Sequence, residues 1–369
     1  MSVVMIRRKM FLRKNNFTLV LICLISLLLI FSSTVFAGTE KEAQHKFRLA
    51  TSDKFWAGQG INAQRLVTAI NYDTGGQIEF EIFPNCALGE EGEFIEGVQL
   101  GTVDTAILSA SILSVYTNKL SPFVTPFLFK DSLSQYEFMF ESGGEGFSPI
   151  MESILEEASK DCGFHVLGVI MEGIKDAYFN IPIDKLDDIK GKKIRLMANQ
   201  IEIDAWKNLG MIPTTLPWSE LYSGLQNKVF DACELSESDF LLYSFNEVAP
   251  YYLGTDHLNY NTVIVMSEKA WNSLSPKLQN IVKEDAAKVS KLECNLSLGL
   301  NQSLISQIKN VTKGMVFLDE EMKIKMRQDV LPKLLDKYGE GIGKNVILAL
   351  AKGDNIVKQW CIDQGWNVD

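Results

Sequence analysis

Along most of the chain, two kinds of segment succeed one another: some alternate apolar and polar residues, and others repeat apolar residues at helical spacing. Residues 77–83 alternate polar and apolar side chains, which predicts a half-buried strand, and a turn at 73–76 separates them from a helix over 58–72. This succession favours an α/β fold with helices packed on the faces of a sheet. Further strands are predicted at 47–50, 103–108, 164–170, 193–197, 229–233 and 262–266, and further helices at 92–100, 149–159, 200–209, 218–226 and from 319 onward.

A much longer helical pattern begins at Ser275 and Pro276, a capping residue followed by a proline suited to the first helical position. Apolar residues then recur at helical spacing until the pattern stops at Gly314. A single helix of about 37 residues would be roughly 55 Å long, which exceeds the diameter of one small domain. The periodicity fits equally well one helix that crosses two domains and two helices with a break between 294 and 300.

The N-terminus has the layout of a secretory signal. Five basic residues precede an apolar run over 17–31, and small residues follow, with Val35 and Ala37 at the −3 and −1 positions of a cleavage site. The alternative is an uncleaved membrane anchor, but the run is shorter than the roughly 20 residues that a membrane span needs. We therefore expect residues 1–37 to be a signal peptide, cleaved after Ala37, and the mature protein to be exported.

The rest of the chain is acidic. Five of the 36 basic residues and none of the 46 acidic ones lie in the first 37 residues, so 31 basic residues face 46 acidic ones in the mature part. Such a balance is unfavourable for nucleic acid, and no nucleic-acid partner is expected. The five mature cysteines are widely spaced, which favours neither a disulfide framework nor a zinc site and leaves open one long-range disulfide.

No familiar catalytic motif stands in the sequence, and the three histidines are far apart. Gly58 and Gly60 approximate a dinucleotide-binding fingerprint, but the acidic residue that should follow about 20 positions later is missing. Three residues are candidates for a binding site. Arg195 lies within a predicted strand, and its guanidinium fits a carboxylate, although it could instead be an ordinary salt-bridged Arg. Trp218 precedes a helix and could instead be a core Trp. Glu234 ends the strand predicted at 229–233, where α/β sheets present ligands, and could instead be a solvated loop carboxylate.

An ordered set of segments resembles the DctP-type substrate-binding proteins of tripartite ATP-independent periplasmic (TRAP) transporters. The resemblance covers residues 46 to about 350, and its strength lies in the order of the segments rather than in any one of them. The matching segments are Thr74–Ile78, Phe83–Pro84 with Leu88–Glu90, Val98–Asp104, Pro126–Leu128, Asp188–Arg195, Pro217–Tyr222 with Leu225–Gln226, Asp231–Glu234, Thr255 with His257, and Trp271 with Leu274.

The resemblance implies a bilobed periplasmic-binding-protein fold, in which two α/β lobes are joined by hinge strands and a long helix crosses both. It also implies discontinuous lobes. We expect lobe I to contain 46–172 plus 261–300 and lobe II 173–260 plus 301–369, with a hinge near Gly173 and Asn261 and a ligand cleft between the lobes.

The family's ligand carboxylate pairs with an Arg that corresponds to Arg195. A second Arg found in many members corresponds to Lys175, which keeps the charge but loses the planar fork. Leu235 stands where sialic acid binders have Asn, which argues against that ligand. Ser109 corresponds to an acidic ligand contact of some sugar-acid binders. The expected ligand-binding residues are Arg195, Lys175, Trp218, Glu234, Leu235, Ser109, Ser52 and Trp56.

We therefore predict a periplasmic, non-enzymatic binding protein that captures a small organic acid and delivers it to the membrane permease subunits of a TRAP transporter. No cofactor or metal is predicted, although the resemblance leaves open a calcium or sodium ion that accompanies the ligand near Glu234. The rival hypotheses are the binding protein of an ABC importer or of a sensor, and a secreted hydrolase.

Overall fold

The computed structural model describes residues 43–368. The predicted signal peptide, 1–37, and its cleavage after Ala37 lie outside the described residues. In the described part, no helix combines the length and apolar character needed to cross a bilayer. The described residues from His45 onward form one compact unit.

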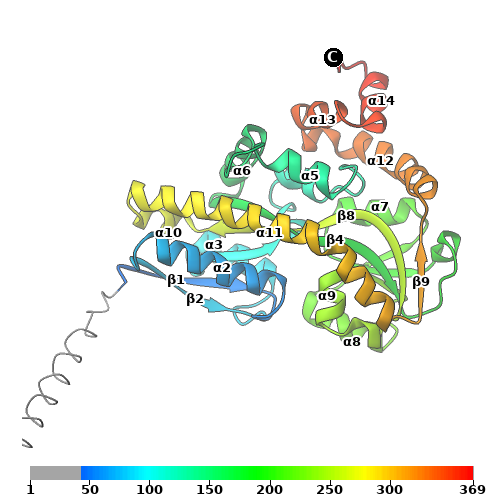
Figure 1. Cartoon of the computed structure of the whole chain (residues 1–369), viewed down its shortest axis with the longest axis horizontal. Helices are drawn as coiled ribbons and strands as arrows, with labels where there is room; N and C mark the ends of the chain where they lie inside the picture. The colour runs from blue at the N-terminus through cyan, green and yellow to red at the C-terminus, as the bar shows by residue number, and fades with distance from the viewer. Residues whose placement is uncertain (1–42, 369) are drawn as a thin grey trace, which may run out of the picture. The chain divides into compact units, whose positions relative to one another are not determined.

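One nine-stranded sheet organises this unit (Figure 1). Its strand order is β2-β1-β3-β8-β4-β7-β5-β6, and β9 pairs with β8. The strands are β1 (His45–Thr51), β2 (Ile78–Phe83), β3 (Thr105–Ser109), β4 (His165–Phe179), β5 (Lys193–Leu196), β6 (Ile212–Thr215), β7 (Ala232–Ser236), β8 (Tyr251–Met266) and β9 (Gly314–Phe317).

The strands β4 and β8 are much longer than the sequence predicts, and they connect the two halves of the sheet. The end of β8 near Met266 pairs with β3 and with the start of β4, whereas its beginning near Tyr251 pairs with β9 and with the end of β4. Between these parts the register of β4 against β8 shifts at Met171–Ile174. Polar residues at Lys175, Asp176 and Asn259 interrupt the apolar pattern there, which is why periodicity finds only the apolar ends of these strands.

Helices cover both halves. The ranges of the α-helices are α2 (Gly58–Asp73), α3 (Glu91–Leu100), α4 (Ala110–Leu113), α5 (Ser132–Met139), α6 (Pro149–Cys162), α7 (Gln200–Asn208), α8 (Leu221–Gln226), α9 (Glu237–Leu242), α10 (Glu268–Ser273), α11 (Pro276–Val311), α12 (Glu320–Ile342), α13 (Lys344–Ala351) and α14 (Asn355–Asp363). Short 3₁₀ turns lie at Asn118–Phe123, Leu186–Ile189, Trp218–Glu220 and Phe245–Glu247.

The long helical pattern forms one uninterrupted helix, α11, with 36 residues. Ser275 caps it, and its hydroxyl accepts a hydrogen bond from the N–H of Leu278. The helix packs against α2 and β4 in one half and α9 in the other, as its course across Figure 1 shows. The structure thus selects the single-helix alternative. The lobe boundaries themselves remain a prediction.

Buried apolar clusters fill each half. One joins β1, α2 and the start of α11, and another joins β7, α8 and α9. All five described cysteines are unpaired. The strand predicted at 229–233 is shifted, because β7 begins at Ala232; Glu234 therefore lies in the middle of a buried strand rather than at its end.

Candidate functional site

A cavity of about 330 Å³ lies where both halves of the sheet contribute residues. Its wall comes from the loop after β1, the start of α3, the strands β4, β5, β7 and β8, the segment 215–218, and α9. Six of the eight residues expected from the sequence line it: Ser52, Lys175, Arg195, Trp218, Glu234 and Leu235. Chain segments far apart in sequence thus meet at the predicted site.

Arg195 is a buried guanidinium, with 2% of its surface exposed. Its Nε donates to the carbonyl oxygen of Leu216 at 2.8 Å, and its Nη2 donates to the same oxygen at 2.5 Å. Within residues 43–368 no carboxylate lies at ion-pair distance from it. Burial lowers the pKa of Arg195, yet a guanidinium stays charged in proteins. A buried cation on a cavity wall is well suited to an anionic ligand.

Lys175 already has anionic partners. Its Nζ lies 2.7 Å from Glu202 Oε2 and 2.6 Å from Glu234 Oε1, and all three side chains are almost fully buried. Burial acts to lower the pKa of Lys175, but the two glutamates raise it above its usual range. The ammonium therefore balances charge within the protein, and Arg195 is left as the cation available to a ligand in the described cavity wall.

Glu234 is equally engaged. Its Oε1 accepts from Lys175, and its Oε2 accepts from Trp206 Nε1 at 2.7 Å and lies 2.9 Å from His257 Nε2. Although burial opposes ionisation, Lys175 and His257 hold the pKa of Glu234 well below its usual range. Both oxygens thus serve the buried network, so the geometry gives no support to a cation bound by Glu234.

Ser109 and Trp56 lie apart from the cavity wall. Ser109 is fully buried at the end of β3, where its Oγ lies 3.2 Å from Met197 Sδ and its N–H donates to Glu91 Oε2. Trp56 is half exposed, and its ring packs on Tyr243 at a centroid distance of 5.6 Å. Ser109 thus contacts two residues of the cavity wall without lining the cavity itself, and Trp56 packs on a residue that does not line it.

The structure adds wall residues that the sequence interpretation missed: Asp53, Glu91, Met197, Asp239 and Tyr260. Burial raises the pKa of Asp53 to about 7 and that of Asp239 to about 6. Asp53 follows the first strand, next to the expected Ser52, so its position was a usable signal. Asp239 lies in a short helix beyond β7, and no spacing rule connects it with the site.

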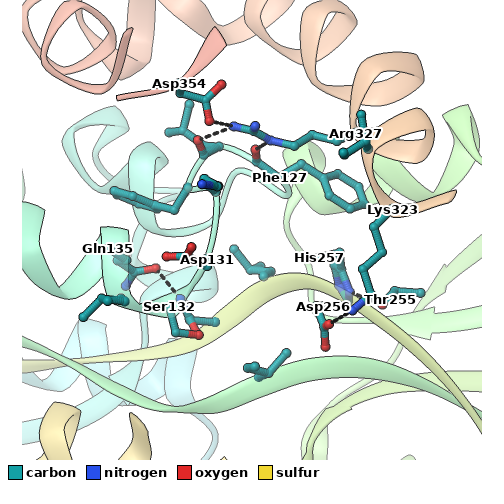
Figure 2. Close-up of a pocket in the computed structure, with 18 of the residues that line it drawn as sticks. Phe127, Asp131, Ser132, Gln135, Thr255, Asp256, His257, Lys323, Arg327 and Asp354 are labelled. Carbon is teal, nitrogen blue, oxygen red and sulfur yellow. Dashed lines mark hydrogen bonds and ion pairs between the residues drawn. The ribbon is translucent and has the colours of Figure 1, made fainter. Parts of the chain in front are cut away.

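A second cavity, of about 800 Å³, lies between β8, α11, α12 and the segment 125–135 (Figure 2). Two of its cations are bound internally: Arg327 donates to the Phe127 carbonyl at 2.7 Å and pairs with Asp354, and Lys323 pairs with Asp256, whereas Lys130 is exposed to solvent. None of the eight expected residues lines it. The smaller cavity, with its unpaired guanidinium, is therefore the better candidate for a ligand site.

Solved structures share this fold. A TRAP periplasmic solute-binding protein from Bordetella matches with a TM-score of 0.74 and 24% identity, over 83% of this chain and 98% of that one. Another, from Sulfurospirillum deleyianum, has a TM-score of 0.73 and 24% identity, over 84% and 98% of the two chains. These structures confirm the predicted bilobed α/β fold.

Sequence relatives agree with the fold. An uncharacterized protein of Salmonella typhimurium, YiiZ, is 31% identical, and the match spans 59% of this chain but only 64% of that protein. A solute-binding protein of Roseobacter denitrificans is 31% identical over 67% of this chain and 73% of its own length. The C4-dicarboxylate-binding periplasmic protein DctP of Vibrio cholerae is 26% identical over 79% of this chain and 85% of that protein.

The family model of bacterial extracellular solute-binding proteins, family 7, matches residues 50–340, which include every strand from β3 to β9 and the whole cavity wall. The chain therefore belongs to this family, the DctP-type solute-binding proteins of TRAP transporters.

Proposed function

We propose that this protein holds a small organic acid in the cavity of about 330 Å³ and delivers it to the membrane permease of a TRAP transporter. The observation that carries the proposal is Arg195, a buried guanidinium on the cavity wall without a carboxylate partner among the described residues. A ligand carboxylate would accept from the guanidinium N–H groups left free by Leu216. Trp218 and Leu235 would contact its carbon skeleton.

The relatives' ligands support the chemical class. One relative is named for C4-dicarboxylates and another, in Escherichia coli, for 2,3-diketo-L-gulonate. Similar structures contain succinate or D-glucuronate. All of these are carboxylates, and the family consists of transport binding proteins rather than enzymes. We infer an exported location from the family and from the predicted signal peptide.

We also propose that the two lobes, 46–172 plus 261–300 and 173–260 plus 301–369, close around the ligand by bending near Gly173 and Asn261. Support comes from the register shift between Met171 and Ile174 and from the φ of +140° at Gly173, a backbone region that favours glycine. Bending at this point of β4 and β8 would move the two sides of the cavity relative to each other and would break few hydrogen bonds between the strands.

The test is binding of organic acids to purified Arg195→Ala. Loss of one partner from a buried charge pair costs about 2–5 kcal/mol, so the dissociation constant for an acid that stabilises the wild type should rise about 30-fold or more. Arg48→Ala is the matched control, because Arg48 is exposed and pairs with Asp104 away from the cavity. An unchanged dissociation constant in a folded Arg195→Ala protein would exclude Arg195 as the ligand's partner.

A further inference from the structure

A separate part of the cavity wall is acidic. Asp53 comes from the loop between β1 and α2, and Asp239 from α9 in the other half of the sheet, and both line the cavity that holds Arg195. Burial and, after it, the charge of Asp239 raise the pKa of Asp53. Both side chains are more than nine-tenths buried. The cavity therefore presents one guanidinium and, elsewhere on its described wall, these two aspartates, in addition to Glu90 and to Glu91, which accepts hydrogen bonds from Ser52, Gln59 and Ser109.

Asp239 has an unused hydrogen-bonding atom. Its Oδ2 accepts from Ser236 Oγ at 2.7 Å, but its Oδ1 is buried and has no hydrogen-bond partner in the described structure. Asp53 is held in place by the Tyr243 hydroxyl at 3.0 Å and by the N–H of Gln59 at 3.0 Å. A buried acceptor without a donor is costly, and a ligand donor would remove that cost.

The protein's own cations act on these two groups only at a distance: burial raises the pKa of Asp239, and the charge of Lys175 opposes that rise, without an ion pair between the two side chains. Lys175 lies between Glu202 and Glu234. Lys54, next to Asp53 in sequence, directs its Nζ over the rings of Trp56 and Tyr243, at 5.0 and 5.2 Å. Neither Asp53 nor Asp239 has an ion pair with a Lys, Arg or His of residues 43–368. A ligand that carries only negative charge would therefore meet uncompensated carboxyl groups.

Resting on the proposed function, we propose that the ligand is a zwitterion: a small carboxylic acid that also carries a protonated amine. The carboxylate pairs with Arg195, and the ammonium donates to Asp239 Oδ1 and to Asp53. An ammonium supplies up to three N–H donors and the positive charge that this part of the wall lacks. A cavity of about 330 Å³ lies at the small end of ligand pockets and suits an amino-acid-sized molecule.

The experiment compares matched ligand pairs by thermal shift and calorimetry. Each pair consists of an amino acid and the acid without its amine: glycine and acetate, β-alanine and propionate, 4-aminobutyrate and butyrate, leucine and 4-methylpentanoate, proline and cyclopentanecarboxylate. Succinate represents dicarboxylates. We expect at least one amino acid to bind about 30-fold or more tightly than its partner, the effect of one desolvated charge contact.

Asp239→Asn and Asp53→Asn should each abolish most of that preference, measured as the ratio of the two dissociation constants within the same variant. Asp256→Asn is the control, because Asp256 is an acidic residue of the second cavity (Figure 2), and it should retain the wild-type preference. In the Arg195→Ala protein, the preferred amino acid and its plain-acid counterpart should both bind weakly.

Three outcomes would overturn the inference: plain acids or succinate that bind as tightly as the amino acids, a preference unchanged by both Asp→Asn variants, or tight binding of a plain acid that needs Ca²⁺ and Asp239. In all three, a carboxylate still binds and still depends on Arg195, so the proposed function survives. Failure of every carboxylate, or binding that ignores Arg195→Ala, would instead reject the proposed function and the inference with it.

Discussion

At the scale of single residues, the structure separates two cations that the sequence makes look alike. Arg195 and Lys175 are both buried and both line the cavity. Lys175 balances Glu202 and Glu234, whereas Arg195 binds only the carbonyl oxygen of Leu216. Patterning placed Arg195 in a strand, and the family resemblance pointed to both residues, but only their three-dimensional partners decide which cation a ligand can use.

Lys175→Met should destabilise the protein strongly. Removal of one partner leaves two glutamates uncompensated in a buried network, a change that typically costs about 3–5 kcal/mol. Urea denaturation monitored by circular dichroism would measure the loss. Lys190→Met is the control, because Lys190 pairs with Asp187 at the surface, and its unfolding midpoint should not move. A Lys175→Met protein as stable as the wild type would show that the two glutamates share a proton instead.

The buried carboxyl groups predict that the ligand-free protein loses stability as pH rises. Burial raises the pKa of Asp53 to about 7, Asp239 to about 6 and Glu237 to about 9, whereas unfolded carboxyl groups lose their protons near pH 4. Between these values the folded state binds more protons, so stability falls with rising pH. The melting temperature should be lower at pH 8 than at pH 6, and Asp239→Asn should narrow the difference. A melting temperature that rises over this range would contradict the assignment.

Two glycines near the site show how a sequence motif can arise from packing. A Cβ on Gly60 would overlap the carbonyl oxygen of Lys54, and one on Gly58 would overlap the carboxylate of Glu172. The G-x-G spacing that approximates a dinucleotide fingerprint therefore reflects two close approaches to α2, by the loop after β1 at Gly60 and by a side chain of β4 at Gly58. A sequence pattern records that a position needs glycine, but it cannot record which neighbour requires it.

At the scale of elements, prediction succeeded where one apolar periodicity runs without interruption. It placed both ends of α11 and of the strand β2 to within about three residues, although periodicity alone left open whether α11 is one helix or two. It failed for the full length of β4 and β8, because their middle residues are polar and line cavities: Lys175 lines the candidate site and Asn259 the second cavity. Asp239 was missed for a related reason, since it lies in a short helix and only the tertiary fold brings it to the cavity wall.

The continuity of α11 can be tested at Gly299, which lies inside the helix with open space where a Cβ would stand. Gly299→Ala should stabilise the protein by about 0.5–1 kcal/mol, because alanine loses less backbone entropy than glycine in a helix. Gly299→Pro should destabilise it by about 3 kcal/mol or more. Guanidinium denaturation would measure both. If Gly299→Ala were instead destabilising, the helix would have to bend at this residue.

At the scale of the whole molecule, direct hydrogen bonds tie the two sides of the cavity together. Asn199, which caps α7, donates to the carbonyl oxygen of Ser111 at 2.9 Å and to Ser114 Oγ at 2.7 Å. The hydroxyl of Tyr243, just after α9, donates to Asp53 Oδ1 and accepts from the N–H of Lys54 at 3.1 Å. If the lobes open and close as proposed, these bonds form only in the closed arrangement, where they favour retention of the ligand.

Tyr243→Phe isolates that contribution, because it removes a single hydroxyl and keeps the ring that packs on Trp56 and Trp218. A hydrogen bond to a charged group contributes about 1.5–3 kcal/mol, so the dissociation constant of a bound acid should rise about tenfold or more. The loss should appear mainly as faster release, since the bond holds the closed state and does not guide encounter. Stopped-flow tryptophan fluorescence, to which Trp218 in the cavity wall contributes, would separate the two rates. Tyr222→Phe is the matched control, because its hydroxyl bonds Glu247 within one half of the fold. Equal release rates in Tyr243→Phe and the wild type would mean that Tyr243 positions Asp53 without holding the lobes together.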